Sequence, residues 1–159
     1  MHRLRGDLLY GRTRADARAA AAVCAAAVSD FKPLKKNKNK LNKDSLEINS
    51  IKLQKNTDIV EYLGKNNKYR PKLVVSFAAE TENLNKNAIS KLKKKNCDFI
   101  IANDVSKKDS GFNSDYNRVS IIDGSGKIKI IKKNKKSFIA NKIAEIILEK
   151  LLVDEKSIN

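Results

Sequence analysis

Four short polar segments could carry chemistry, because each follows an apolar stretch or opens a helix-like pattern. They cover residues 29–31, 56–59, 77–80 and 103–106. In sheets of parallel strands, ligands bind at the carboxyl ends of the strands, in the loops that lead to helices. Asn56, Thr57 and Asp58 open a predicted helix, so their backbone N–H groups could hold a phosphate or the edge of a base. The alternative for this segment is simple helix capping.

Lysines form the second group of candidates. Lys91 and Lys95 are four residues apart, so both ammonium groups project from the same side of a predicted helix. Two cations on one stripe suit a triphosphate, although lysines in a last helical turn also interact favourably with the helix dipole and are often only solvated. A lysine-rich loop that could close over an anionic substrate contains Lys35, Lys36, Lys38, Lys40 and Lys43. Without a phosphate-binding glycine loop, nucleophile elbow or metal-ligand cluster, these residues predict only an anion or nucleotide site.

The elements that must position these residues alternate between strand-like and helix-like periods. Buried strands are predicted to end at Ala25–Val28 and to cover Lys72–Phe77 and Asp98–Ala102, and Ser45–Leu53 is a less regular candidate. A hairpin is predicted from Val119–Ile122 and Lys127–Ile131, with residues 123–126 as its turn. The predicted helices run from Ile59 to a stop at Gly64, over Glu82–Lys95 with Leu84, Ala88 and Leu92 on one face, and from Ser137 with Ile139, Ile143, Ile146, Ile147 and Leu151 inward. The predicted loops are residues 32–45 and 103–114.

Apolar strands that alternate with helices are typical of a parallel sheet covered on both faces. The predicted fold class is therefore α/β, a Rossmann-like domain of three layers with a mainly parallel sheet. The length of 159 residues suits one domain. The longest uncharged apolar run, Ala19–Val28, is shorter than the roughly 20 residues of a membrane span, so no membrane partner is expected. Cys24 and Cys97 are far apart, which predicts free thiols in a reducing cytoplasm and no zinc site.

The chain is strongly basic, with 34 Lys and Arg against 18 Asp and Glu and a formal net charge of +16. Such an excess attracts polyanions, so a basic nucleic-acid-binding protein is the alternative function. A gene rich in A and T also encodes many lysines and asparagines, so base composition is a second explanation of the basic charge. The four Tyr and five Phe are not interleaved with the charge as a base-stacking platform requires, so no specific nucleic-acid partner is expected.

The composition changes sharply near residue 31. Residues 1–31 contain no lysine, and five of the seven arginines lie in the first 18 positions. We therefore expect residues 1–18 to be unrelated to the domain and without fixed structure, residues 19–153 to form the domain, and residues 154–159 to be a tail.

Six motifs follow in order along the chain: AAAVSDFKP from Ala25, the lysine loop, LQKNTDI from Leu53, VVSFAAET from Val74, KLKKKNCDFIIANDVS from Lys91 and GFNSDYNRV from Gly111. Together they resemble the C-terminal two-thirds of the phosphopantothenate–cysteine ligase family. The resemblance implies a cytoplasmic, homodimeric ligase of coenzyme A biosynthesis. It would use CTP and Mg²⁺ to join 4'-phosphopantothenate and cysteine through an acyl-cytidylate, with no flavin in this chain.

Site residues are carried over from the resemblance by position. Asp30 matches the acidic residue that recognises the nucleotide, and Phe77 matches the aromatic residue beside it. The segment from Asn56 to Ile59, with Thr57 in place of the usual Pro and Asp58 after it, matches the turn that reads cytosine. Lys91 and Lys95 match the lysines that face the triphosphate.

The remaining matches concern two loops. Lys40 matches the essential catalytic lysine of the flexible loop, and Lys43 the last lysine of that motif, although Asn42 stands where a lysine is expected. Asn103 and Asp104 match a loop near the dimer interface and active site.

One departure from the family pattern shapes the expected activity. The family's glycine-rich start and its acyl-binding Asn segment have no counterpart in this sequence, so we expect an N-terminally truncated ligase domain. Such a chain should bind nucleotide and form little product. A regulatory or inactive remnant is a third hypothesis.

Overall fold

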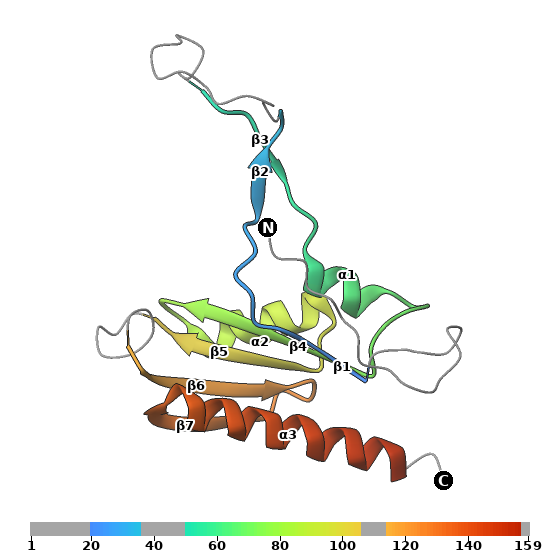
Figure 1. Ribbon diagram of the computed structural model, residues 1–159, viewed down its shortest axis with the longest axis vertical. Helices are drawn as coiled ribbons and strands as arrows, with labels where there is room; N and C mark the ends of the chain where they lie inside the picture. Colours follow the sequence, from blue (N-terminus) through green and yellow to red (C-terminus); the bar gives the residue numbers. More distant parts are fainter. Residues whose placement is uncertain (1–19, 36–49, 106–113, 157–159) are drawn as a thin grey trace.

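The computed structural model describes residues 20–35, 50–105 and 114–156, with side chains described up to residue 153. A five-stranded sheet forms its centre, in the order β1-β4-β5-β6-β7 (Figure 1). The strands are β1 (Ala21–Cys24), β4 (Leu73–Glu80), β5 (Phe99–Asp104), β6 (Tyr116–Asp123) and β7 (Ile128–Lys135). The neighbours β1, β4 and β5 are parallel, and β6 is antiparallel to both β5 and β7. Since only β6 runs in the reverse direction, the prediction of a mainly parallel sheet is confirmed.

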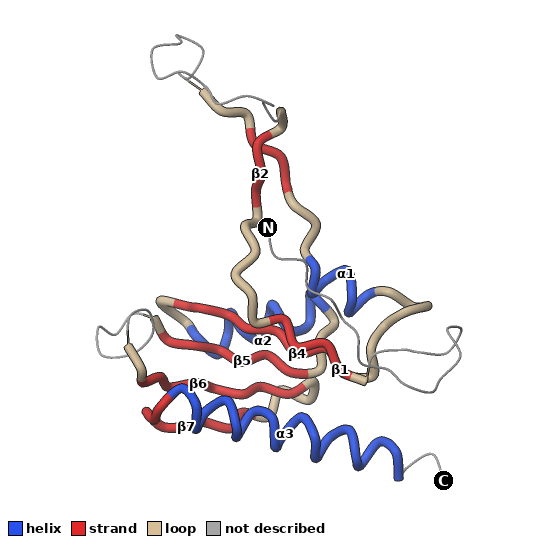
Figure 2. Tube along the Cα trace, in the orientation of Figure 1, coloured by secondary structure: helices blue, strands red, loops and turns tan. Residues whose placement is uncertain are grey.

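Helices cover both faces of the sheet, as Figure 2 shows. On one face, α1 (Ile59–Lys65) and α2 (Leu84–Lys95) pack on a core that includes Val74, Ile100 and Leu92. On the other face, α3 (Lys136–Lys156) packs on a core of alternate residues of the same strands. The predicted α/β fold in three layers is therefore confirmed.

The helices follow from their apolar spacing. Ala88 and Leu92 are buried on the inner face of α2 and Leu84 is partly buried, as their four-residue spacing predicts. The inward residues predicted for α3 all lie in or against its core: Ile139, Ile143, Ile146, Ile147 and Leu151. The helix α2 ends at Asn96, whose left-handed backbone (φ 52°) directs its N–H to the carbonyls of Leu92 and Lys93.

The predicted hairpin is confirmed as β6 and β7. The Asp123 carboxylate accepts hydrogen bonds from the backbone N–H groups of Ser125 (3.0 Å) and Lys127 (3.0 Å) and from the Ser125 hydroxyl (2.6 Å). These contacts close the turn and hold the pKa of Asp123 below its usual range, with the Ser125 hydroxyl the largest cause.

A two-stranded antiparallel ribbon, β2 (Phe31–Pro33) with β3 (Leu53–Lys55), projects away from the sheet (Figure 1). It leaves the body between β1 and α1, so the chain returns from the ribbon directly into the segment that opens α1. Three of the four large apolar residues on or beside it, Phe31, Ile51 and Leu53, are more than half exposed.

Several predicted boundaries are wrong. Residues 25–28 are an exposed loop, because the strand that pairs with β4 ends at Cys24; a run of small alanines has no alternation that marks its end. Residues 50–52 are not a strand, and residues 45–49 lie outside the described residues. Gly64 lies inside α1, which ends one residue later, and Asn103 and Asp104 belong to β5 instead of the predicted loop.

Candidate functional site

Two of the predicted segments meet where the ribbon joins the body. The backbone N–H of Asn56 donates to the carbonyl of Asp30 (2.8 Å), and its side-chain amide donates to the carbonyl of Ser29 (2.7 Å). These bonds join the chain leaving β1 to the chain entering α1. The Asn56 amide is thus used to hold the junction, while the exposed Asp30 carboxylate has no partner among the described residues.

Asp58 is the N-cap of α1. Its Oδ1 accepts from the backbone N–H of Glu61 (3.0 Å), and its Oδ2 forms an ion pair with Lys95 Nζ (2.9 Å). Partial burial raises the pKa of Asp58, but the Glu61 N–H and the Lys95 ammonium outweigh burial and hold it below its ordinary value. Helix capping by Asp58 is therefore real, and the same carboxylate also ties α1 to α2.

A recess of about 460 Å³ adjoins this helix start. It is lined by Thr57, Asp58, Glu61, Tyr62, Lys65 and Asn66. Ile59 begins the helix beside it and is 47% exposed. The segment from Asn56 to Ile59 thus borders a hollow large enough for part of a small ligand.

The two lysines predicted to share one helix side each meet a carboxylate. Lys91 Nζ lies 2.7 Å from Glu80 Oε1 at the end of β4, and Lys95 Nζ lies 2.9 Å from Asp58. The charges of these four groups sum to zero. Both lysines are therefore paired with carboxylates, whereas their four-residue spacing alone predicted two unpaired cations on one side of the helix.

Phe77 and Asn103 lie apart from this group. Side chains alternate along a strand, and Val75 and Ile101 belong to the core under α3. Phe77 and Asn103 therefore face the α3 side of the sheet, whereas the group around Lys95 lies on the other side. Asn103 Oδ1 is buried and has no hydrogen-bond partner among the described residues.

Glu80 ends the predicted segment of residues 77–80, but sequence reasoning assigned its side chain no role of its own. Its side chain is only 10% exposed, and it stands next to Asp104 in the register of β4 and β5. Position alone could have indicated it, because Glu80 is a carboxylate at the carboxyl end of a buried parallel strand. The structure thus brings Glu80, Lys91 and Asp104 to one edge of the sheet.

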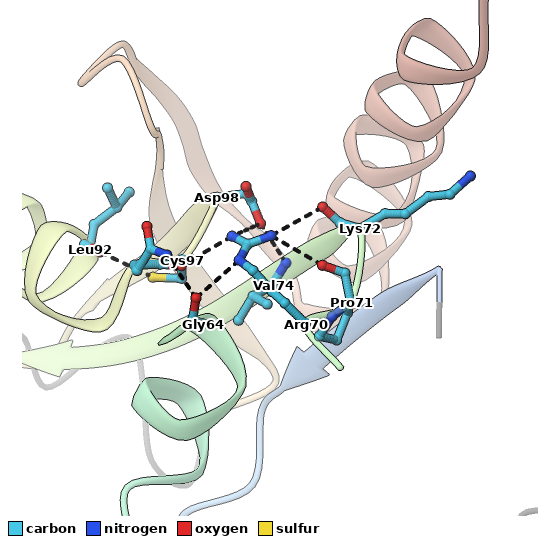
Figure 3. Close-up of polar contacts among 9 residues, drawn as sticks. Gly64, Arg70, Pro71, Lys72, Val74, Leu92, Cys97 and Asp98 are labelled. Atoms are coloured by element: carbon cyan, nitrogen blue, oxygen red, sulfur yellow. Dashed lines mark hydrogen bonds and ion pairs between the residues drawn. The ribbon is translucent and has the colours of Figure 1, made fainter. Parts of the chain in front are cut away.

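Arg70 fixes the helices that carry these groups (Figure 3). Its guanidinium donates to the carbonyls of Gly64 (3.1 Å), Pro71 (3.1 Å) and Asn96 (3.1 Å) and pairs with Asp98 Oδ2 (2.9 Å). The same Asp98 oxygen accepts from the backbone N–H of Val74 (2.7 Å). One side chain therefore ties the end of α1 to the end of α2 and to the start of β4.

Both cysteines are free thiols, as predicted. Burial raises the pKa of Cys97 to about 11. Burial also raises the pKa of Cys24, and the nearby Asp58 carboxylate adds to this. Neither environment favours a reactive thiolate.

Two absences concern the described ranges only. Within them, no three His, Cys, Asp or Glu side chains gather as a metal site would require. None of the helices there is long and apolar enough to cross a membrane. Lys40 and Lys43 of the predicted loop lie outside the described residues, and so do the junction at residue 18 and residues 157–159 of the predicted tail, while residues 154–156 continue α3. The division of the chain stays a prediction.

Known proteins resemble this chain in sequence and in fold. The Coenzyme A biosynthesis bifunctional protein CoaBC of Borreliella burgdorferi is 42% identical over 124 residues, which are 77% of this chain and 30% of that protein. A protein named Cysteine/Cysteine sulfinic acid decarboxylase, from an unknown prokaryotic organism, is 40% identical over 127 residues, 80% of this chain and 35% of that protein. This chain thus spans about a third of the length of these relatives.

A solved structure supports the same relationship. The C-terminal domain of a Coenzyme A biosynthesis bifunctional protein CoaBC superposes with a TM-score of 0.62 at 27% identity, covering 84% of this chain and 55% of that one. Residues 8–151 match the family described as the DNA/pantothenate metabolism flavoprotein C-terminal domain. The match begins inside the stretch expected to be unrelated and continues to near the end of α3. The chain therefore belongs to the DNA/pantothenate metabolism flavoprotein C-terminal domain family.

Proposed function

We propose that this chain carries the nucleotide-binding part of a CTP-dependent phosphopantothenate–cysteine ligase of coenzyme A biosynthesis. The observation that carries the proposal is the junction of Asp30 with Asn56, beside the Asp58–Lys95 pair. It brings the segments assigned to base recognition next to a lysine assigned to the phosphates. The relatives named for coenzyme A biosynthesis support this choice, and they give no support to the nucleic-acid-binding alternative.

The proposed recognition of CTP uses the turn at residues 56–59. The side chains of Asn56 and Asp58 are engaged in structural contacts, so the base is read by backbone groups of residues 56–59. The Asp30 carboxylate accepts hydrogen bonds from donors on the nucleotide. A turn fixed in this way presents its groups without a large ordering cost on binding.

The proposed reaction has two steps. A carboxylate oxygen of 4'-phosphopantothenate attacks the α-phosphorus of CTP, the bond to the β-phosphate bridging oxygen breaks, and pyrophosphate leaves. The amine of cysteine then attacks the acyl carbon, CMP leaves with the bonding electron pair, and the amine loses a proton. Lys91 and Lys95 offset the charge of the phosphates, and Lys40 serves the same end from the lysine loop.

Magnesium fits this site as an ion bound mainly by the phosphates of the nucleotide. The described residues offer no cage of three acidic, His or Cys side chains. Mg²⁺ commonly binds phosphate oxygens with only one or two protein carboxylates. Asp104, at the end of β5 beside Glu80 in the register, is the carboxylate that would hold it. Bound there, the ion would supply neutralisation of phosphate charge.

The remaining expectations about the assembly stay part of the proposal. A cytoplasmic homodimer suits the enzyme, and the exposed apolar residues of the ribbon support an association between two copies, because an isolated two-stranded ribbon is marginally stable in water. The family description contains the word flavoprotein, and the absence of flavin from this chain stays a prediction.

Calorimetric titration of the chain with CTP and with ATP tests the proposal. Because the turn at residues 56–59 would read a small pyrimidine edge, CTP should bind more tightly than ATP. Equal affinities would contradict a cytosine-reading turn.

A further inference from the structure

Glu80 holds a fixed position at the end of β4. Its Oε1 accepts from Lys91 Nζ (2.7 Å), and its Oε2 accepts from the side-chain amide of Asn87 (3.3 Å). The Asn87 amide also donates to the carbonyl of Glu82 (3.0 Å). Both carboxylate oxygens are therefore engaged by residues of α2, one turn apart on the same helix face.

Lys91 is held by this carboxylate but remains open to solvent, since its side chain is 45% exposed while that of Glu80 is 10% exposed. An ammonium group has three donors, so Lys91 can meet another anion from the solvent side. A phosphate oxygen in contact with Nζ would then lie within a few ångströms of Glu80. Because the Glu80 carboxylate is poorly hydrated, the repulsion between its charge and that of the phosphate is only weakly screened. Glu80 therefore weakens anion binding at Lys91, whether the carboxylate stays paired with Lys91 or moves away from it.

We propose that Glu80 is a built-in competitor for the outer phosphates at Lys91, an inference that rests on the proposed function. A triphosphate tethered through its bound base has a high effective concentration at Lys91 and overcomes the competitor. Pyrophosphate, once cut from the nucleotide, has no such tether. Glu80 then regains Lys91 and favours release of pyrophosphate, so the site retains CTP and rejects the product.

The second pair, Asp58 with Lys95, is a poorer place to test this idea. Asp58 also caps α1 through the Glu61 N–H, so its replacement would disturb the helix start. Glu80 caps no helix. Replacement of Glu80 by glutamine keeps the side-chain length and one oxygen acceptor toward α2, removes the charge and replaces the second carboxylate oxygen with an amide donor.

The experiment titrates the purified chain with pyrophosphate and with CMP, by calorimetry at fixed salt. The Glu80→Gln variant should bind pyrophosphate about fivefold or more tightly than the original chain. CMP affinity should stay within about twofold, because CMP lacks the outer phosphates that meet Lys91. Glu145→Gln is the matched control: it removes the carboxylate of an ion pair of the same length (2.7 Å) with Lys142 on α3, and it should change neither affinity.

Further variants separate this role from a merely structural one. In a Lys91→Met background, Glu80→Gln should bring no gain in pyrophosphate affinity. Weaker pyrophosphate binding by Glu80→Gln would show that Glu80 orients Lys91, and unchanged binding would show a structural pair; either result overturns the proposal. So would a failure of both the original chain and the variant to bind pyrophosphate.

A measurement on the unmutated chain covers the case in which Glu80→Gln does not fold. Saturation with pyrophosphate should shift the carboxyl carbon resonance of Glu80 as its pair with Lys91 opens, and no shift at saturation would overturn the proposal. Since pyrophosphate has no base, these results are independent of the CTP–ATP comparison. Equal CTP and ATP binding would refute the ligase proposal while leaving the competitor role standing.

Discussion

Replacement of Gly64 by alanine should loosen the crossing of α1 and α2. A Cβ atom added at Gly64 would lie 2.1 Å from the carbonyl oxygen of Lys95 and 2.7 Å from that of Asn96. Both are backbone atoms, so no side-chain rotation relieves the contact. The two helix ends must separate by more than an ångström to reach ordinary contact distance.

The expected cost combines three effects. Overpacking of this kind costs about 1–3 kcal/mol. Separation also strains the hydrogen bonds that the Gly64 carbonyl accepts from Asn96 Nδ2 (2.7 Å) and Arg70 Nε (3.1 Å), about 1 kcal/mol each. The better helix propensity of alanine returns about 1 kcal/mol. The net loss in the free energy of unfolding should be about 2–4 kcal/mol, which lowers Tm by roughly 4–16 °C for a chain of this size.

Urea and thermal unfolding of Gly64→Ala measure this loss. Gly124→Ala is the matched control, because its added Cβ would meet only the Asp98 carbonyl at 3.9 Å and Gly124 has no positive φ. The control should change stability by less than about 0.5 kcal/mol. If Gly64→Ala were as stable as the original chain, the close crossing of the two helices would be refuted.

Two further predictions concern the supports of the site. Arg70→Met should lower the free energy of unfolding by about 3 kcal/mol, because it removes the charged partner of Asp98 and one hydrogen-bond donor from each of three backbone carbonyls. Arg70→Lys should not restore this stability, and equal stability of the original chain and both variants in urea would contradict the prediction. The Cys97 thiol, with a pKa raised to about 11, should hold roughly 100-fold less thiolate at pH 8 than in the unfolded chain, so alkylation followed by mass spectrometry should label it far more slowly in the native state. Since the native pKa is the higher one, the associated stability is complete below pH 9 and is lost as the pH rises toward 11.

The sequence carried enough information for most of the fold. Val74 and Ile100 lie in continuous apolar runs, and a parallel strand covered on both faces needs such a run. The spacing of Ala88 and Leu92 was sufficient to define the buried face of α2. The end of β1 was not predictable, because uniform alanine gives no alternation; the strand stops where its pairing with β4 stops.

The site was predictable as a set of segments but not as a set of contacts. Helix spacing correctly put Lys91 and Lys95 on one helix, but their carboxylate partners come from β4 and from the start of α1. Such partners depend on how distant elements pack, which a local pattern does not contain. For the same reason, the separation of Phe77 from Lys95 by the sheet needed the strand register.

The titration with CTP and ATP tests the central claim most directly, if it is repeated at low and high salt. A turn that reads cytosine predicts tighter binding of CTP, with a preference that survives added salt because hydrogen bonds to the base are not screened as surface charges are. The Lys91→Ala and Lys95→Ala double variant should lose CTP affinity and keep CMP affinity. Weak binding of both nucleotides that is equal at low salt and vanishes at high salt would mean nonspecific attraction to a chain of charge +16, and would contradict the proposed ligase site.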